Sequence, residues 1–227
     1  MRYRVGVMTV AMVAAAWVAR AQQRQYPDLP VLPRELEIEL ALNAAPAHLR
    51  DAATVLVLES SGYVTARTGS NPFTCIVSRR GGDIVPICWD AEGARTMVPI
   101  EVDAAKLRLG GMSNAEIDRH VSEGFRSGRY PAPARTGISY MLSPLRYRID
   151  ASGQVTRTAP LPHVMFYGPS LTDADIGGAR GTAVFMNKVG PDGMIIVPVG
   201  SAEKQTILDA SASLVERVER QLGYRRP

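Results

Sequence analysis

The stretch that decides the fold is FTCIVSRRGGDIVPICW, residues 73–89. Two runs rich in β-branched residues flank the glycine pair at 81–82, which suits a two-residue hairpin loop because both positions tolerate a positive φ. In that hairpin the paired residue numbers sum to 163, so Cys75 faces Cys88. Counting outward from the turn makes this a non-hydrogen-bonded pair, with Cα atoms about 4.5 Å apart. The sequence therefore predicts a disulfide across an antiparallel hairpin.

The same register places Pro86 opposite Val77. Because proline has no N–H to donate, we expect the second strand to be an edge at that residue. A disulfide that closes a loop of this size stabilises the fold by about 3 kcal/mol in the chain-entropy treatment. The alternative is a redox-active or metal-binding cysteine pair. No C-x-x-C motif and no neighbouring histidine supports it, so we interpret the pair as structural.

The N-terminal segment predicts export. Arg2 and Arg4 form a positive region, residues 5–18 are an apolar run, and Ala19-Arg20-Ala21 matches an A-x-A cleavage site. A membrane anchor is the alternative, but the run is short and an arginine follows it directly. We therefore expect a signal peptide over residues 1–21 and a periplasmic or secreted protein, in a compartment where thiols oxidise.

Composition narrows the class of protein. The chain has 227 residues, with 46% hydrophobic and 21% charged content, which excludes disorder, collagen and coiled coil. Of its 26 basic residues three lie in the expected signal peptide, so 23 remain against 22 acidic ones. A mature chain this close to neutral is not expected to bind nucleic acid. After signal removal no apolar run is long enough for a membrane span.

Hydrophobic patterns predict the organisation of the remaining chain. Residues 22–33 form a proline-rich, extended lead-in, and 34–227 form a single α+β domain. The segment 34–44 alternates like a strand but consists of strong helix formers, so we favour a helix. Runs at 54–58 and 62–67 are expected to join the cysteine hairpin in an antiparallel, four-stranded meander.

Helices and strands are expected to follow in separate groups. Ser113 and Glu116 form a capping box within a helical region at 91–130, and strand patterns return between 138 and 199. The last predicted element is an amphipathic helix of about 20 residues, which Ser201 caps and Gly223 ends. Segregated strands and helices indicate α+β: a mainly antiparallel sheet built from hairpins, with helices packed on it.

Strong catalytic motifs are absent from the sequence. It contains no G-x-S-x-G, H-E-x-x-H, P-loop or G-x-G-x-x-G motif, and no cofactor is identified. Ser201-Ala202-Glu203-Lys204 matches the S-x-x-K of serine acylases but stands where a helix cap is needed, so we interpret it as the cap. Residues 173–178 are similar to the start of a calcium loop, although Val184 stands where such a loop needs its glutamate.

The most suggestive chemistry lies around a predicted strand at 163–167. His163 and Tyr167 share one face of that strand, and a glycine-rich loop with Thr172, Asp173 and Asp175 follows it. His163 with either aspartate can form a general base with its orienting carboxylate. Tyr167 and Thr172 are candidate ligand-binding residues at the same strand end.

A metal site is the second interpretation of this histidine. Asp90 and Glu92, which follow the second cysteine, can join His163 as ligands. The structural alternative is that the histidine bonds a neighbour and the carboxylates cap turns. Three histidines in the chain do not decide between these alternatives.

Three motifs carry a resemblance to other proteins. They are G-S-N-x-F-T-C at 69–75, C-x-D-A-E-G at 88–93 and P-H-x-M-F-Y at 162–167. With them the chain resembles an uncharacterised family of bacterial exported proteins over most of its mature length. The resemblance implies export and a single domain, and it assigns no catalytic residue.

The sequence therefore favours an exported, non-catalytic module that binds a small molecule or a protein partner. The alternative is a secreted hydrolase or metal-dependent enzyme that uses His163 with Asp173 or Asp175. A bound metal stays open under either hypothesis.

Overall fold

In the computed structural model, the described residues are 29–150 and 152–224, and they form an α+β fold. The expected signal peptide at 1–21 and the lead-in up to residue 28 lie outside the described residues. From residue 29 the lead-in contains no helix or strand, and its Leu29 and Leu32 are buried. No helix in the described part of the chain is both long and apolar enough to cross a membrane.

In the described residues the sheet has ten strands, eight of which follow the order β2-β1-β3-β4-β5-β8-β10-β9, while β6 pairs with β4 and β7 pairs with β6. The strands are β1 (Thr54–Glu59), β2 (Gly62–Arg67), β3 (Thr74–Ser78), β4 (Asp83–Trp89), β5 (Ile138–Met141), β6 (Tyr147–Ile149), β7 (Val155–Arg157), β8 (His163–Tyr167), β9 (Phe185–Met186) and β10 (Met194–Pro198). The helices are α2 (Arg34–Leu42), α3 (Ala47–Arg50), α4 (Ala91–Thr96), α5 (Val98–Leu109), α6 (Asn114–Arg126) and α7 (Ser201–Leu222).

The cysteine hairpin is confirmed in register and in chemistry. Cys75 pairs with Cys88 across β3 and β4, the Cα atoms are 4.0 Å apart, and a disulfide joins the side chains. Gly81 and Gly82 both have positive φ, +70° and +82°, as the two-residue loop requires. Towards its other side β4 pairs with β6 near one end and with β5 near the other, and Pro86 lies between these two pairings. β4 is therefore an interior strand, and on this side it lacks a paired strand only around Pro86, where proline has no N–H to donate.

The predicted meander is wrong in one connection. β1 pairs in parallel with β3, through Thr54 opposite Thr74, so β2 lies at the edge. After β2 the chain returns along the start of β1, where two backbone N–H groups, of residues 70 and 71, bond to the carbonyl of Ala52. A Cβ on Gly69 would lie 2.2 Å from that carbonyl oxygen. Glycine therefore permits the close crossover that makes the pairing parallel.

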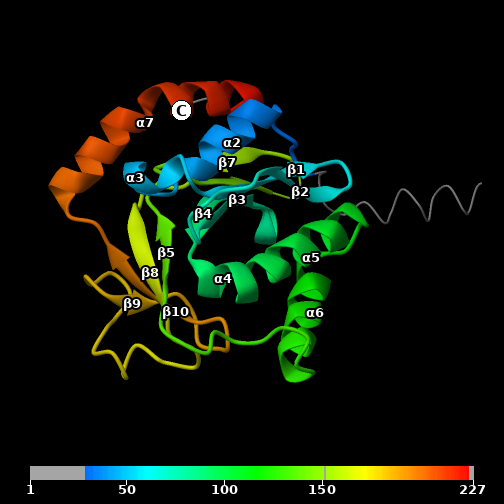
Figure 1. Cartoon of the computed structure of the whole chain (residues 1–227), viewed down its shortest axis with the longest axis vertical. Helices are drawn as coiled ribbons and strands as arrows, with labels where there is room; N and C mark the ends of the chain where they lie inside the picture. The colour runs from blue at the N-terminus through cyan, green and yellow to red at the C-terminus, as the bar shows by residue number, and fades with distance from the viewer. Residues whose placement is uncertain (1–28, 151, 225–227) are drawn as a thin grey trace, which may run out of the picture.

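Helices cover the two faces of the sheet unequally. Figure 1 shows α2 and α7 on one side of the β1–β4 region and α4, α5 and α6 on the other. The disulfide belongs to the core beneath α2 and α7, with Leu40 and Val218. The second core joins the opposite face of β3 and β4 to α5 and α6, through Ile76, Ile100 and Val121 among others. The strands β8, β10 and β9 extend beyond α5, which positions the site described below.

Most predicted helix ends are confirmed. Residues 34–42 form a helix, as favoured over the strand that their alternation also allowed. The Ser113–Glu116 capping box is present at α6. The prediction that Ser201 caps α7 is wrong, because Gly200 is the N-cap and makes no side-chain cap bond. Ser201 is instead the first helical residue. Gly223 ends α7 with φ +64°, as a left-handed C-cap residue does.

Candidate functional site

The sheet face that carries α5 is left open over β5, β8 and β10, and a cleft forms there. Its inner chamber has a volume of about 190 Å³ and lies beside Ile100 and Glu101 of α5. Its outer chamber has a volume of about 690 Å³ and extends to His163 and Arg180. The two chambers share Met141, Arg146, Met165 and Asn187, so we treat them as one cleft.

The floor of the inner chamber is apolar and rich in sulfur. It is built from Ile87, Trp89, Met97, Met141, Met165 and Met194. The strand residues among them reach one surface because alternate side chains of β4, β5, β8 and β10 point to the same face. Met97 joins them from the junction between α4 and α5. Methionine adapts to ligands of different shape because its chain is unbranched and polarizable. Such a floor suits the apolar body of a small molecule.

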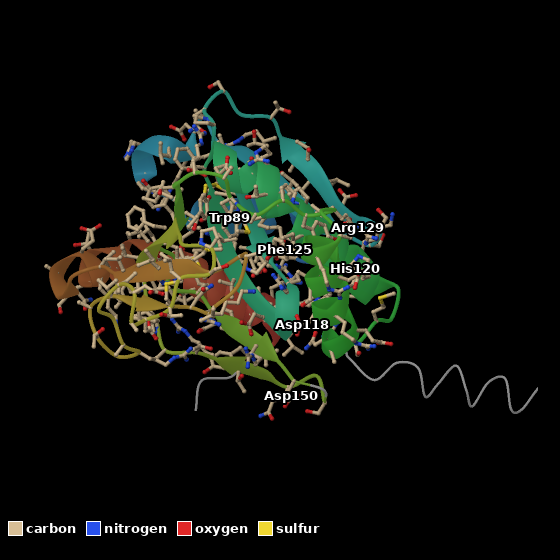
Figure 2. The ribbon with its side chains drawn as sticks, turned by 90° about the horizontal axis from the view of Figure 1, so that it is seen from below. Trp89, Asp118, His120, Phe125, Arg129 and Asp150 are labelled. Atoms are coloured by element: carbon tan, nitrogen blue, oxygen red, sulfur yellow. A yellow bond between two sulfur atoms is a disulfide. The ribbon has the colours of Figure 1, made fainter. Side chains whose placement is uncertain are left out.

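Trp89 is the polar exception on that floor. Its ring stacks on Tyr167 at a centroid distance of 6.3 Å, and the residue is 3% exposed. Its indole Nε1 is buried and, among the described residues, has no hydrogen-bond partner. A buried N–H without an acceptor is costly, and the residue that carries it lines the inner chamber. Figure 2 labels Trp89, the last residue of β4.

Glu101 stands at the rim of the inner chamber. Its carboxylate accepts a hydrogen bond from the hydroxyl of Ser78, 2.6 Å away. Burial raises the pKa of Glu101, while Arg80 and the bond from Ser78 oppose the rise. A carboxyl group with a raised pKa in an apolar cleft is a recurring feature of functional sites.

Basic side chains outnumber acidic ones around the cleft. Asp192 is shared between Lys188, at 2.5 Å, and Arg80, at 3.4 Å. Asp83 pairs with Arg146 at 2.9 Å and also holds a second arginine, Arg148. Arg180 lines the outer chamber, and no described residue forms an ion pair with it. Four cations, Arg80, Arg146, Arg180 and Lys188, therefore face three acids, of which Glu101 is displaced toward its neutral form.

His163 closes the far end of the outer chamber and is 5% exposed. Its Nδ1–H donates to the carbonyl of Leu161 at 2.5 Å, which leaves the lone pair on Nε2. Within the described chain no residue hydrogen-bonds that Nε2. Burial lowers the pKa of His163, and the nearby charge of Arg146 lowers it further. The imidazole is therefore neutral near neutral pH.

The two aspartates expected beside His163 accept hydrogen bonds from other residues and so stabilise the glycine-rich loop. Asp173 accepts from the backbone N–H of Met186 at 2.6 Å. Asp175 accepts from both the N–H and the hydroxyl of Thr172, and these bonds lower the pKa of Asp175. In the described residues neither aspartate hydrogen-bonds or ion-pairs with His163. The structure thus gives this histidine no orienting carboxylate.

The two acids expected as metal ligands also have structural partners. Asp90 caps α4 through the N–H of Gly93 and accepts from the hydroxyl of Tyr167 at 2.8 Å. Glu92 accepts from Arg95 and from the N–H of Ala134, both at 2.7 Å.

These contacts keep the acids away from His163. Tyr167 stands four residues beyond His163 on β8, a distance of about 13 Å along the strand. Over the described residues no group of three or more His, Cys, Asp or Glu side chains is placed to hold a metal ion. The candidate ligand-binding residues Tyr167 and Thr172 line neither chamber.

Sequence reasoning missed the polar rim of the cleft. Ser78 ends a buried strand and Arg80 follows it, Glu101 lies on a helix, and Lys188 and Asp192 lie in a later turn. No motif links these positions, and only the folded sheet brings them together. The one available signal was Glu101, an acid four residues after Met97 on the apolar side of a helix.

Comparisons with known protein families, with curated proteins and with solved structures gave no match to this chain.

Proposed function

We propose that the protein is a non-catalytic binding protein whose cleft takes a small organic anion with an apolar body. The observation that carries the proposal is the composition of the cleft: a methionine and tryptophan floor beneath an excess of cationic side chains. The apolar body packs on the floor, where burial of apolar surface supplies the affinity. The acidic group lies toward the cations, which also attract it from solution.

Trp89 adds a specific contact to this arrangement. Its unpartnered Nε1–H donates to an acceptor atom of the ligand, which removes the cost of leaving that group unbonded. Its stacking on Tyr167 holds the indole in place, because the Tyr167 hydroxyl is itself held by Asp90. The donor is therefore positioned before the ligand arrives.

A catalytic role for His163 with Asp173 or Asp175 has no comparable support. Both aspartates are engaged in their own loop, and a general base needs a hydrogen-bonded partner to orient it. We therefore keep the binding function as the proposal.

Action outside the cytoplasm, in the periplasm or after secretion, is part of the same proposal. The Cys75–Cys88 disulfide and the predicted signal peptide support it. The resemblance to an uncharacterised exported family is in keeping with it and remains a prediction.

Fluorescence titration tests the proposed ligand class. The chain has two tryptophans, and Trp17 lies in the expected signal peptide. The mature form that begins at Gln22 therefore keeps Trp89 as its one tryptophan, and the emission of Trp89 reports on the cleft. The probes are octanoate, octanol and octylamine, which share an apolar chain and differ in charge. We expect saturable binding of octanoate at least about tenfold tighter than that of octylamine, because the rim is cationic.

Matched variants locate the binding. Arg80→Gln and Lys188→Gln should weaken octanoate, whereas Arg95→Gln, on an arginine that does not line the cleft, should not. Equal binding of octanoate and octylamine, or no saturable change with any of the three probes, would contradict the proposal.

A further inference from the structure

The outer chamber brings His163, which the anion proposal does not use, together with two methionines of the floor. Met141 of β5 lies directly opposite His163 of β8 in the antiparallel register. Met165 stands two residues after His163 and so projects from the same face. All three side chains line the outer chamber. One imidazole and two thioethers therefore converge on a single space.

The spacing of these residues suits a common bound ion. Directly opposed residues in an antiparallel pair have Cβ atoms about 4.5–5.5 Å apart. Positions two apart on one strand are separated by about 6.5–7 Å. Methionine reaches across such distances because it has three rotatable bonds. The rigid member is His163, whose ring the Leu161 carbonyl holds through Nδ1.

The donor atoms decide which ion fits. A backbone carbonyl on one ring nitrogen is the usual outer-shell partner of a histidine that binds metal through the other nitrogen. The second and third donors are neutral thioethers, which prefer soft ions and select Cu(I) among the biological metals. No carboxylate lines the outer chamber, and Arg146 and Arg180 add positive charge to it. A monovalent ion tolerates that environment better than a divalent one.

Cysteine does not compete for such an ion. The chain has two cysteines, and both are consumed by the Cys75–Cys88 disulfide on the opposite face of the sheet. Thioethers are thus the soft ligands that the folded protein offers.

We propose that His163 Nε2 and the sulfur atoms of Met141 and Met165 form a binding site for Cu(I). This set replaces the combination of His163 with Asp90 and Glu92 that the sequence suggested. It does not depend on the proposed anion function, because Trp89, Glu101 and Arg80 of the inner chamber take no part in it.

The test uses Ag(I), a redox-stable analogue of Cu(I), and Cu(I) itself in competition with a chromophoric chelator. We expect one ion per chain with the disulfide intact. His163→Gln, Met141→Leu and Met165→Leu should each weaken binding at least about tenfold. Met194→Leu, which changes the inner floor, and Met112→Leu, at an exposed residue, should bind as the unchanged protein does.

A second measurement needs no substitution at the site. In protein labelled at the methionine methyl groups, Ag(I) should shift the Met141 and Met165 resonances and leave that of Met112 in place. Shifts confined to other methionines, or unaltered affinity in the three site variants, would overturn the proposal. Tighter binding of Zn²⁺ than of Ag(I) would overturn it as well. The octanoate titration is independent, so failure of one proposal leaves the other standing.

Discussion

Glu101, in the first turn of α5, accepts a hydrogen bond from the hydroxyl of Ser78, the last residue of β3. The contact fixes the edge of the cleft and places a carboxyl group against its apolar floor. Burial raises the pKa of Glu101, and Asp192 adds to the rise. Arg80, Ser78 and Lys188 act in the opposite direction.

Glu101→Gln should make the protein more stable at neutral pH and less sensitive to pH. A carboxyl group whose pKa is raised on folding contributes stability below its unfolded pKa, and this contribution is lost as pH rises through the folded pKa. Glutamine keeps the acceptor for Ser78 and does not ionise. The gap in free energy of unfolding between the variant and the unchanged protein should therefore widen from mildly acidic to neutral pH.

Denaturant unfolding at both pH values measures this gap. Glu123→Gln serves as the control, because that carboxylate lies on the surface with its partner Arg126 and is half exposed. The interpretation fails if the Glu101→Gln gap is constant with pH, or if the Glu123→Gln gap changes as much.

Gly93→Ala should destabilise the protein by about 1–3 kcal/mol, the usual cost of overpacking. A Cβ there would lie 2.2 Å from the Tyr167 hydroxyl and 2.8 Å from the Trp89 ring. Tyr167→Phe alone should cost about 1 kcal/mol through the lost bond to Asp90. Because the phenylalanine removes the nearest clashing atom, Gly93→Ala should cost less in that background.

A double-mutant cycle followed by thermal unfolding detects this coupling. Gly200→Ala is the control for an unobstructed Cβ, since no atom lies within 4 Å of a Cβ at that position. Its cost, which arises from the N-cap of α7, should be the same with and without Tyr167→Phe. Additive effects of the two substitutions would show that the Tyr167 hydroxyl does not set the space at Gly93.

Local rules predicted the parts of the fold that local forces control. Two adjacent glycines and the regular pairing of a β-hairpin were enough to predict that Cys75 lies opposite Cys88. No contact between distant segments of the chain was needed for that prediction. The capping box at Ser113 and the left-handed stop at Gly223 rest on residues within one helical turn.

The parts that sequence reasoning missed depend on contacts between distant segments. The parallel pairing of β1 and β3 requires the close crossover at Gly69, and a glycine before a turn has many other uses. Glu101, Arg80 and Asp192 line one chamber although they come from α5, from the β3–β4 turn and from the segment between β9 and β10, and no single segment encodes that meeting. His163 and Met141 face each other only through the register of β5 with β8.

Removal of the disulfide by Cys75→Ala with Cys88→Ala should cost about 3 kcal/mol, because the bond restricts the unfolded chain more than the folded hairpin. The two cysteines are 13 residues apart, which makes the closed loop short. Urea unfolding of the unchanged protein with and without a reducing agent should show a similar loss. The double variant is the control and should not respond to the reducing agent. If the free energy of unfolding does not change, the disulfide does not stabilise the hairpin, and the prediction is wrong.

Arg79→Met should destabilise the protein by about 3–5 kcal/mol, the usual effect of stripping one partner from a buried ion pair. Arg79 donates to Glu37 at 2.7 Å, and their side chains are 1% and 0% exposed. Burial raises the pKa of Glu37, and Arg79 counters that rise. Without the arginine, Glu37 should favour its protonated form more strongly, so the deficit should shrink as pH falls.

The double variant Glu37→Leu with Arg79→Met should be more stable than Arg79→Met alone, because no unpaired charge then remains in the core. The exposed pair of Arg34 and Glu59 provides the control: Arg34→Met should cost no more than about 1 kcal/mol. Urea unfolding at neutral and mildly acidic pH measures all three variants. If the double variant is no more stable than the single one, the cost arises from the bonds that Arg79 gives to the carbonyls of Val77 and Pro30 rather than from the stranded carboxylate.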